Sequence, residues 1–207
     1  YAARDREAVR KLVQLQTSDP SHHLTAIGGL LGYPACCVQA FDALGDRSDN
    51  SYNRVAAAVR TSVGDAWPAL LDDTVIKVLP HFPCTYRCER SLGQARRLVE
   101  ALTDEHPKVR ETLLGFLGGP VLYFDHDHQI RFRGFPTGGG VRYRGVSIPW
   151  STSKAFAALA GAIAMGDYLV LADEEMTIYR NEGRLFSMRR IDPHLGVLMP
   201  FAREVVT

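Results

Sequence analysis

The chain has 207 residues, of which 46% are hydrophobic, so it can bury a sizeable core and is not a disordered segment. Its formal net charge is +1, with 24 basic and 23 acidic residues, which gives no general reason to expect binding to nucleic acid or to an anionic membrane. The most apolar run, residues 156–172, is interrupted by glycines and an aspartate and is too short to span a bilayer, so we expect no membrane segment.

The N-terminal part of the chain predicts a series of helices. Apolar residues recur at helical spacing through residues 2–16, and the break at Pro20 ends this pattern. Ser21 is a suitable N-cap for a second helix, which Gly32 ends, and Pro34 suits the first turn of a third. The expected helices and helical turns are 2–16, 21–31, 34–44, 52–63, 67–71, 91–102 and 107–117, with a strand or extended lead-in at 74–79.

The pattern changes after residue 120, where short apolar or alternating runs predict strands. Residues 125–129 are a candidate hairpin turn, and residues 181–183 form another turn. An alanine-rich helix is expected at 153–165. The expected strands are 121–124, 130–132, 141–148, 168–171, 176–179, 185–188 and 197–198.

Helices in one part of the chain and strands in the other predict an α+β fold. We expect a helical N-terminal lobe, residues 1–119, that carries the cysteine site. It packs with a mainly antiparallel β lobe, residues 120–207, that contains one helix. The two lobes are expected to form one compact unit.

All four cysteines lie in two stretches that each follow a proline and each open a predicted helix. The first stretch has Cys36 and Cys37 after Pro34, and the second has Cys84 and Cys88 after Pro83. A helix N-terminus stabilises a thiolate, which is the form that binds metal. We therefore predict one site in which all four cysteines are metal ligands.

Cysteine spacing favours an iron–sulfur cluster over a lone zinc ion. Structural zinc sites commonly place two residues between paired cysteines, whereas these pairs are separated by none and by three. Adjacent cysteines can reach two different irons of a larger cluster. Zinc remains the alternative cofactor, and a metal-free thiol redox protein and four simply buried cysteines are further alternatives. Four cysteines without a secretory pattern favour a reducing compartment, and we expect a cytoplasmic protein.

Two residues near the second cysteine pair are candidate catalytic groups. His81 lies three residues before Cys84, where it can act as a ligand, a hydrogen-bond donor or a proton donor. Glu89 directly follows Cys88 and could orient a small-molecule substrate at an open metal position. The chain would then be an enzyme, but the sequence identifies neither the reaction nor the oligomeric state.

Other polar residues are weaker candidates. His22 and His23 precede the first cysteines, and we expect them on a solvated helix surface. His126 and His128, with their neighbouring aspartates, fall at a predicted hairpin tip and are better explained as a solvated turn. Alternating arginines could receive an anion on one face of the sheet, although an ordinary solvated face is favoured. These are Arg131, Arg133, Arg142 and Arg144.

The two cysteine stretches resemble an uncharacterised prokaryotic family, a domain of unknown function with a Gly-Tyr-Pro-x-Cys-Cys-x-x-x-Phe pattern and a downstream His-x-Pro-Cys-x-x-x-Cys pattern. Residues 32–41 and 81–88 carry this resemblance. It implies a shared cysteine site and no particular activity. A looser similarity connects the cysteines to heterodisulfide reductase-like proteins, which bind a four-iron cluster. This chain departs from them in its three residues between Cys84 and Cys88.

Overall fold

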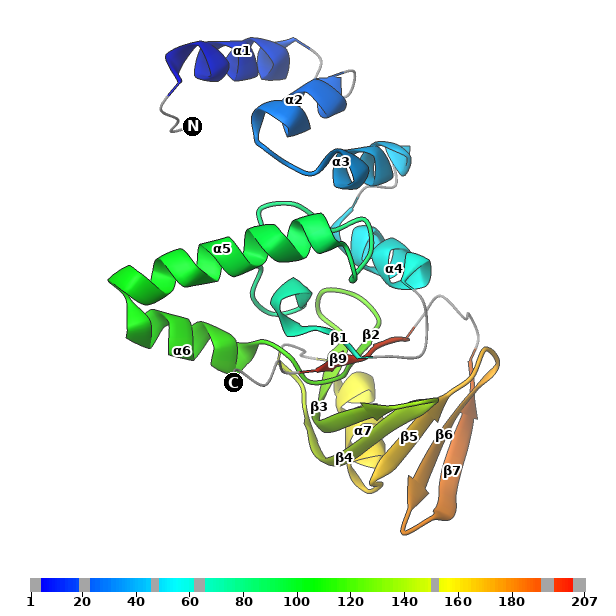
Figure 1. The fold of residues 1–207 in the computed structure, drawn as a ribbon. Coiled ribbons are helices and arrows are strands. Elements are labelled where there is room, and N and C mark those ends of the chain that lie inside the picture. Colours follow the sequence, from blue (N-terminus) through cyan, green and yellow to red (C-terminus); the bar gives the residue numbers. More distant parts are fainter. Residues whose placement is uncertain are drawn as a thin grey trace.

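The computed structural model describes residues 5–18, 23–45, 49–61, 66–149, 153–190 and 196–202. It confirms the α+β fold: helices fill the N-terminal part of the chain, and a mainly antiparallel sheet fills the rest (Figure 1). Among these residues, no helix is both long enough and apolar enough to cross a membrane.

The first three helices are α1 (Arg6–Thr17), α2 (Leu24–Leu30) and α3 (Ala35–Asp42). The Asp5 side chain caps α1 by accepting hydrogen bonds from the N–H groups of Glu7 and Ala8. Gly32, at a φ of +73°, follows α2 in the left-handed conformation that glycine adopts without strain. Pro34 is the N-cap of α3, so both cysteines of the first stretch fall in the first turn of that helix.

The middle of the chain is partly irregular. Helix α4 (Asn50–Arg60) is followed by the short strand β1 (Trp67–Pro68) and a 3-10 turn, η3 (Ala69–Leu71). Residues 74–79, expected as a strand or an extended lead-in, form no strand, and at their start the buried Asp72 carboxylate accepts hydrogen bonds from the N–H and hydroxyl of Thr74, which fixes a turn there. Helices α5 (Glu89–Glu105) and α6 (Pro107–Phe116) then form a hairpin.

Seven strands form one sheet in the order β7-β6-β5-β4-β3-β2-β8, and every neighbouring pair is antiparallel. Helix α7 (Lys154–Ala164) packs on it (Figure 1). The strands are β2 (Val121–Tyr123), β3 (Gln129–Thr137), β4 (Gly140–Ser147), β5 (Tyr168–Leu171), β6 (Glu175–Arg180), β7 (Gly183–Arg189) and β8 (Val197–Met199). Strand β9 (Phe201–Ala202) leaves the sheet and pairs in parallel with β1.

Strand β2 contributes to two hydrophobic cores because its side chains alternate. Val121 and Tyr123 face the core beneath α5 and η3, whereas Leu122 faces the core between the sheet and α7. The first core also contains Phe201 of β9. The helical part that holds the cysteine loop is therefore packed directly against the edge of the sheet.

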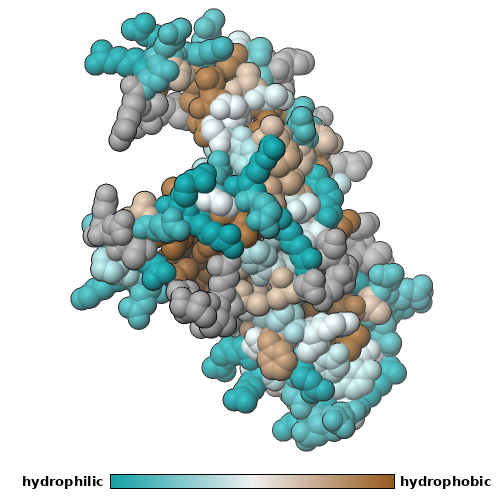
Figure 2. All heavy atoms as spheres, viewed as in Figure 1, coloured by the Kyte–Doolittle hydropathy of each residue, from teal (hydrophilic) through white to brown (hydrophobic). Residues whose placement is uncertain are grey.

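Helices α1–α3 meet the rest of the chain at few points. Figure 1 shows them in succession above α4 and α5, and Figure 2 shows an open notch between α1 and the far end of α5. Gln94 of α5 donates a hydrogen bond to the carbonyl oxygen of Gly32 at 2.7 Å, and Tyr33 packs on His81 with ring centroids 5.0 Å apart. The cysteines form the other main connection.

Candidate metal centre

The structure brings the two cysteine stretches together, as predicted. Cys36 and Cys37 lie in the first turn of α3. Cys84 lies in the loop before α5, and Cys88 is the N-cap of α5. The site thus joins two helix N-termini that are far apart in the sequence.

The four sulfur atoms form a tight group. The Sγ atom of Cys88 lies 3.8 Å from that of Cys36 and 3.7 Å from that of Cys37, and the sulfurs of the adjacent pair are 4.0 Å apart. All four sulfurs, including that of Cys84, lie within 4.8 Å of one another. All four cysteines are free, so the group is not explained by a disulfide.

The loop between Cys84 and Cys88 is anchored by Tyr86, which is completely buried. Its ring stacks on Trp67, with centroids 5.1 Å apart, and meets Phe201 edge-on at 4.9 Å. Its hydroxyl donates to Asp73 Oδ1 at 2.8 Å, and its N–H donates to Thr61 Oγ1 at 2.8 Å. The core therefore fixes the middle of the loop, and the cysteines on either side are held in place.

Ser91 connects the cysteines to His81. Its hydroxyl oxygen lies 3.2 Å from the Sγ atom of Cys37 and 3.0 Å from Nε2 of His81. When Cys37 is a thiolate, the Ser91 hydroxyl donates to it and accepts from His81 Nε2–H. The backbone N–H of Cys84 also donates to the Cys37 sulfur, at 3.3 Å. Cys37 thus has two donors that stabilise its negative charge.

The sequence interpretation missed Ser91, although a signal was present. Ser91 lies three residues after Cys88, so one helical turn places both on the same side of α5. Gln94, three residues further along, was missed for a different reason: its partner is a backbone carbonyl on a distant segment. Such a contact leaves no pattern in the sequence.

Local hydrogen bonds and burial give the cysteine thiols different pKa values. Burial by itself raises the pKa of Cys88, but hydrogen bonds from the Ser91 side chain and backbone and from neighbouring thiols lower it to about 7. Burial and the neighbouring thiols raise the pKa of Cys84 to about 11. Burial also raises the pKa of Cys37 well above its ordinary value, despite the bonds from Ser91 and Cys84. At neutral pH a bound metal would therefore have to displace protons from buried thiols.

His81 is buried and neutral at neutral pH. Burial, together with the nearby Lys77 ammonium, lowers the pKa of His81 to about 4. Its Nε2 is engaged by Ser91, and its Nδ1 has no hydrogen-bond partner in the described part of the chain. His81 therefore lies beside the cysteine group, whereas Glu89 is exposed at the first position of α5.

The donor set fits a soft metal ion. Four thiols within reach of one centre are the ligands that zinc and iron–sulfur sites use. Among the residues that the structure describes, these four cysteines are the one group of potential ligands that comes together in this way.

The other candidate residues have different roles. His23 is the residue before α2, and His22 lies outside the described residues. The Asp125 carboxylate accepts bonds from the N–H groups of Asp127 and His128 and from His128 Nδ1, as expected for a solvated hairpin turn.

Three of the sheet arginines have different surroundings. Arg131 pairs with the buried Asp72 at 2.7 Å, and Arg142 lies over the ring of Tyr168 at 4.9 Å from its centroid. Arg133 is exposed on the same strand as Arg131. Arg131 therefore has a structural role in the ion pair with Asp72.

Comparison of the chain with protein-family models, with curated proteins and with solved structures gave no match.

Proposed function

We propose that the chain is a metalloprotein in which Cys36, Cys37, Cys84 and Cys88 bind a single metal ion, zinc, that joins α3 to the start of α5. The observation that carries this proposal is that all four sulfurs lie within 4.8 Å of one another. Because a tetrahedron's edge is about 1.6 times its centre-to-corner distance, zinc–sulfur bonds of about 2.3 Å place the ligating sulfurs about 3.8 Å apart. Three of the separations, 3.7, 3.8 and 4.0 Å, agree with that value.

An iron–sulfur cluster is the other identity that this donor set allows. The adjacency of Cys36 and Cys37 favoured a cluster because neighbouring residues were expected to reach different irons. Their sulfurs lie 4.0 Å apart, close to the edge of a tetrahedral site, so one ion can bind both. A four-iron cluster binds each thiolate through a separate iron, which requires a wider separation of the sulfurs. The separation of the sulfur atoms therefore supports the proposal of a single ion.

Bound in this way, the metal has a structural task. Helices α1–α3 contact the rest of the chain at few points, and the four cysteines lie at that junction. Four thiolates close the coordination shell of zinc and leave no open position for a substrate. The ion would then stabilise the folded arrangement of the two segments.

Metal analysis after anaerobic purification tests this proposal. We expect about one zinc per chain and no visible absorption. Serine at any one of the four cysteines should sharply weaken zinc binding, whereas Glu89→Gln, next to Cys88, should leave it unchanged. Several irons per chain with brown colour would overturn the single-ion proposal, and full zinc content in all four serine variants would remove the cysteines as ligands.

A thiol redox function is a second candidate, favoured by one observation. The pKa of Cys88 is lowered to about 7, and its sulfur lies 3.7 Å from that of Cys37. Oxidation would form one disulfide between them and transfer two electrons and two protons to an acceptor disulfide. Metal-free protein that shows a reversible disulfide in glutathione redox buffers would favour this function over metal binding.

We also propose that the two cysteine stretches place the chain in the uncharacterised prokaryotic family that they resemble. Support comes from the structure of the site, in which both stretches contribute to one group. The proposal is tested by whether other chains that carry the first pattern also carry the second.

A cytoplasmic location is consistent with four reduced cysteines and is tested by fractionation of cells that express the protein.

A further inference from the structure

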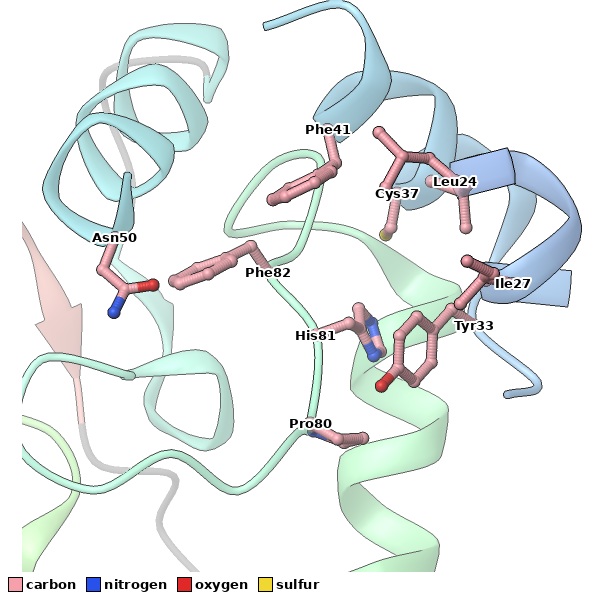
Figure 3. A pocket seen from close by; sticks show the side chains of 11 residues that line it. Leu24, Ile27, Tyr33, Cys37, Phe41, Asn50, Pro80, His81 and Phe82 are labelled. Atoms are coloured by element: carbon pink, nitrogen blue, oxygen red, sulfur yellow. The ribbon is translucent and has the colours of Figure 1, made fainter. Parts of the chain in front are cut away.

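A pocket of about 300 Å³ lies directly beside the cysteine site. It is enclosed by α2 and α3 on one side and by the segment 80–82 and the start of α4 on the other (Figure 3). Its volume is at the lower end of the range for pockets that bind small molecules. The lining residues are Leu24, Ile27, Gly28, Tyr33, Cys37, Val38, Phe41, Asn50, Pro80, His81 and Phe82.

The pocket walls are mostly apolar and partly aromatic. Figure 3 shows the rings of Phe41 and Phe82 from opposite segments, with Leu24 and Ile27 on the α2 side. Tyr33 and His81 form a second pair of rings, with centroids 5.0 Å apart. Such surfaces favour a flat, apolar ligand that can stack on rings.

Two lining residues can carry a charge: His81, which is neutral at neutral pH, and Cys37, whose sulfur is negatively charged when it binds a metal. Two cations lie over the ring of Phe82, Lys77 at 3.3 Å and Arg54 at 5.7 Å from its centroid, but neither lines the pocket, and Arg54 pairs with Asp73. An anionic ligand would lose its water in this pocket without meeting a positive charge in the lining, and it would lie beside the Cys37 sulfur. The lining therefore selects against anions.

Asn50 provides a polar group at one end of the pocket. Its carboxamide makes no hydrogen bond to any residue that the structure describes, and Figure 3 shows its side-chain oxygen turned toward Phe82. A carboxamide offers both a donor and an acceptor. At the opposite end, Cys37 is shared between the pocket wall and the cysteine group.

We propose that this pocket binds one small molecule that carries an aromatic ring and a hydrogen-bonding group and no negative charge. The rings of Phe41 and Phe82 contact its apolar part, and the Asn50 carboxamide binds its polar group. The bound molecule lies against Cys37, next to the metal centre. This site is independent of which metal the cysteines bind, because the lining supplies all of these contacts.

A matched pair of fluorescent probes tests both the binding and the charge selection. N-phenyl-1-naphthylamine is uncharged and fluoresces in apolar surroundings, and 8-anilino-1-naphthalenesulfonate has the same rings with an added sulfonate. Titrated into the full chain as purified, the uncharged probe should show saturable one-to-one binding. The sulfonate should bind at least about tenfold more weakly, because it must be desolvated without a counter-charge. Equal or tighter binding of the sulfonate, or no binding of the uncharged probe, would overturn the proposal.

A pair of variants on one helix tests the location. Leu24→Trp adds a larger side chain inside the pocket and should reduce binding of the uncharged probe by at least about tenfold. Leu30→Trp makes the same change on α2 outside the pocket lining and should bind as the natural chain does. Equal binding by both variants would place the probe elsewhere and refute the assignment. The comparison of the two probes on the natural chain still tests the proposal if Leu24→Trp folds poorly.

Discussion

Replacing Ser91 with alanine removes a hydroxyl that contacts both the cysteine site and His81. The hydroxyl oxygen lies 3.2 Å from the Cys37 sulfur and 3.0 Å from His81 Nε2, and Ser91 is completely buried. Alanine therefore removes one of the donors to the Cys37 thiolate, and no water can easily replace it. Loss of such a partner behind a ligand typically lowers metal affinity about 10- to 100-fold. We expect that loss for Ser91→Ala, which corresponds to about 1.4–2.7 kcal/mol of binding free energy.

The measurement is a competition for zinc between the protein and a coloured chelator at neutral pH. Ser153→Ala is the control: its hydroxyl caps α7 by accepting from the N–H of Phe156, away from the cysteines. Loss of that cap should lower the free energy of unfolding by about 1 kcal/mol and leave zinc affinity unchanged. Zinc affinity of Ser91→Ala within threefold of the natural chain, or an equal loss in Ser153→Ala, would refute the role assigned to Ser91.

Three further predictions concern stability and local motion. Arg131→Ala should lower the free energy of unfolding by about 3 kcal/mol, because it leaves the buried Asp72 carboxylate without its partner at 2.7 Å. Arg133 is exposed on the same strand, so Arg133→Ala should change the free energy of unfolding by less than about 0.5 kcal/mol. Equal effects of the two variants in chemical denaturation would contradict the role assigned to the ion pair of Arg131 and Asp72. The pKa of His81 is about 4 in the folded protein, below its ordinary value of 6.5. Between pH 6.5 and pH 4, His81 therefore takes up a proton in the unfolded chain but not in the folded protein. The free energy of unfolding should therefore fall by at most about 3 kcal/mol as the pH drops from about 6.5 to 4. Denaturation curves of the natural chain and of His81→Gln at several pH values should show that the variant lacks this part of the pH dependence. Removal of the metal by a chelator should speed hydrogen exchange across residues 24–42 more than in the central strands of the sheet; equal acceleration in both would show that the ion does not act at the junction.

Much of the fold follows from local sequence signals. Helical periodicity and proline positions predicted that the first cysteine pair opens α3 and that the second precedes α5. The hairpin at Asp125 was also predictable, because an aspartate side chain that bonds to following N–H groups is a local turn signal. Of the two alternatives for the segment 74–79, a strand or an extended lead-in, the strand does not form, and a β-branched run could not reveal that the buried Asp72 carboxylate fixes a turn at Thr74.

For the candidate site, too, one part could be predicted from the sequence and another part could not. Grouping of cysteines at two helix starts was visible in the sequence and predicted one shared site. The separation of their sulfurs was not, because it depends on how α3 and α5 approach each other and on Tyr86, which anchors the intervening loop in the core. The proposal of a single ion rests on that separation.

By itself, the sequence determined the α+β class, the succession of most helices and strands, and the set of four thiols, since each depends on residue type and on spacing along a short segment. The tertiary structure alone decided the contact from Ser91 to Cys37 and His81, the pairing of Arg131 with Asp72, and the pocket beside the cysteines. Each of these joins segments that are distant in the chain or depends on the direction in which a buried side chain points. Such contacts arise from packing of whole elements, which no local pattern of residues records.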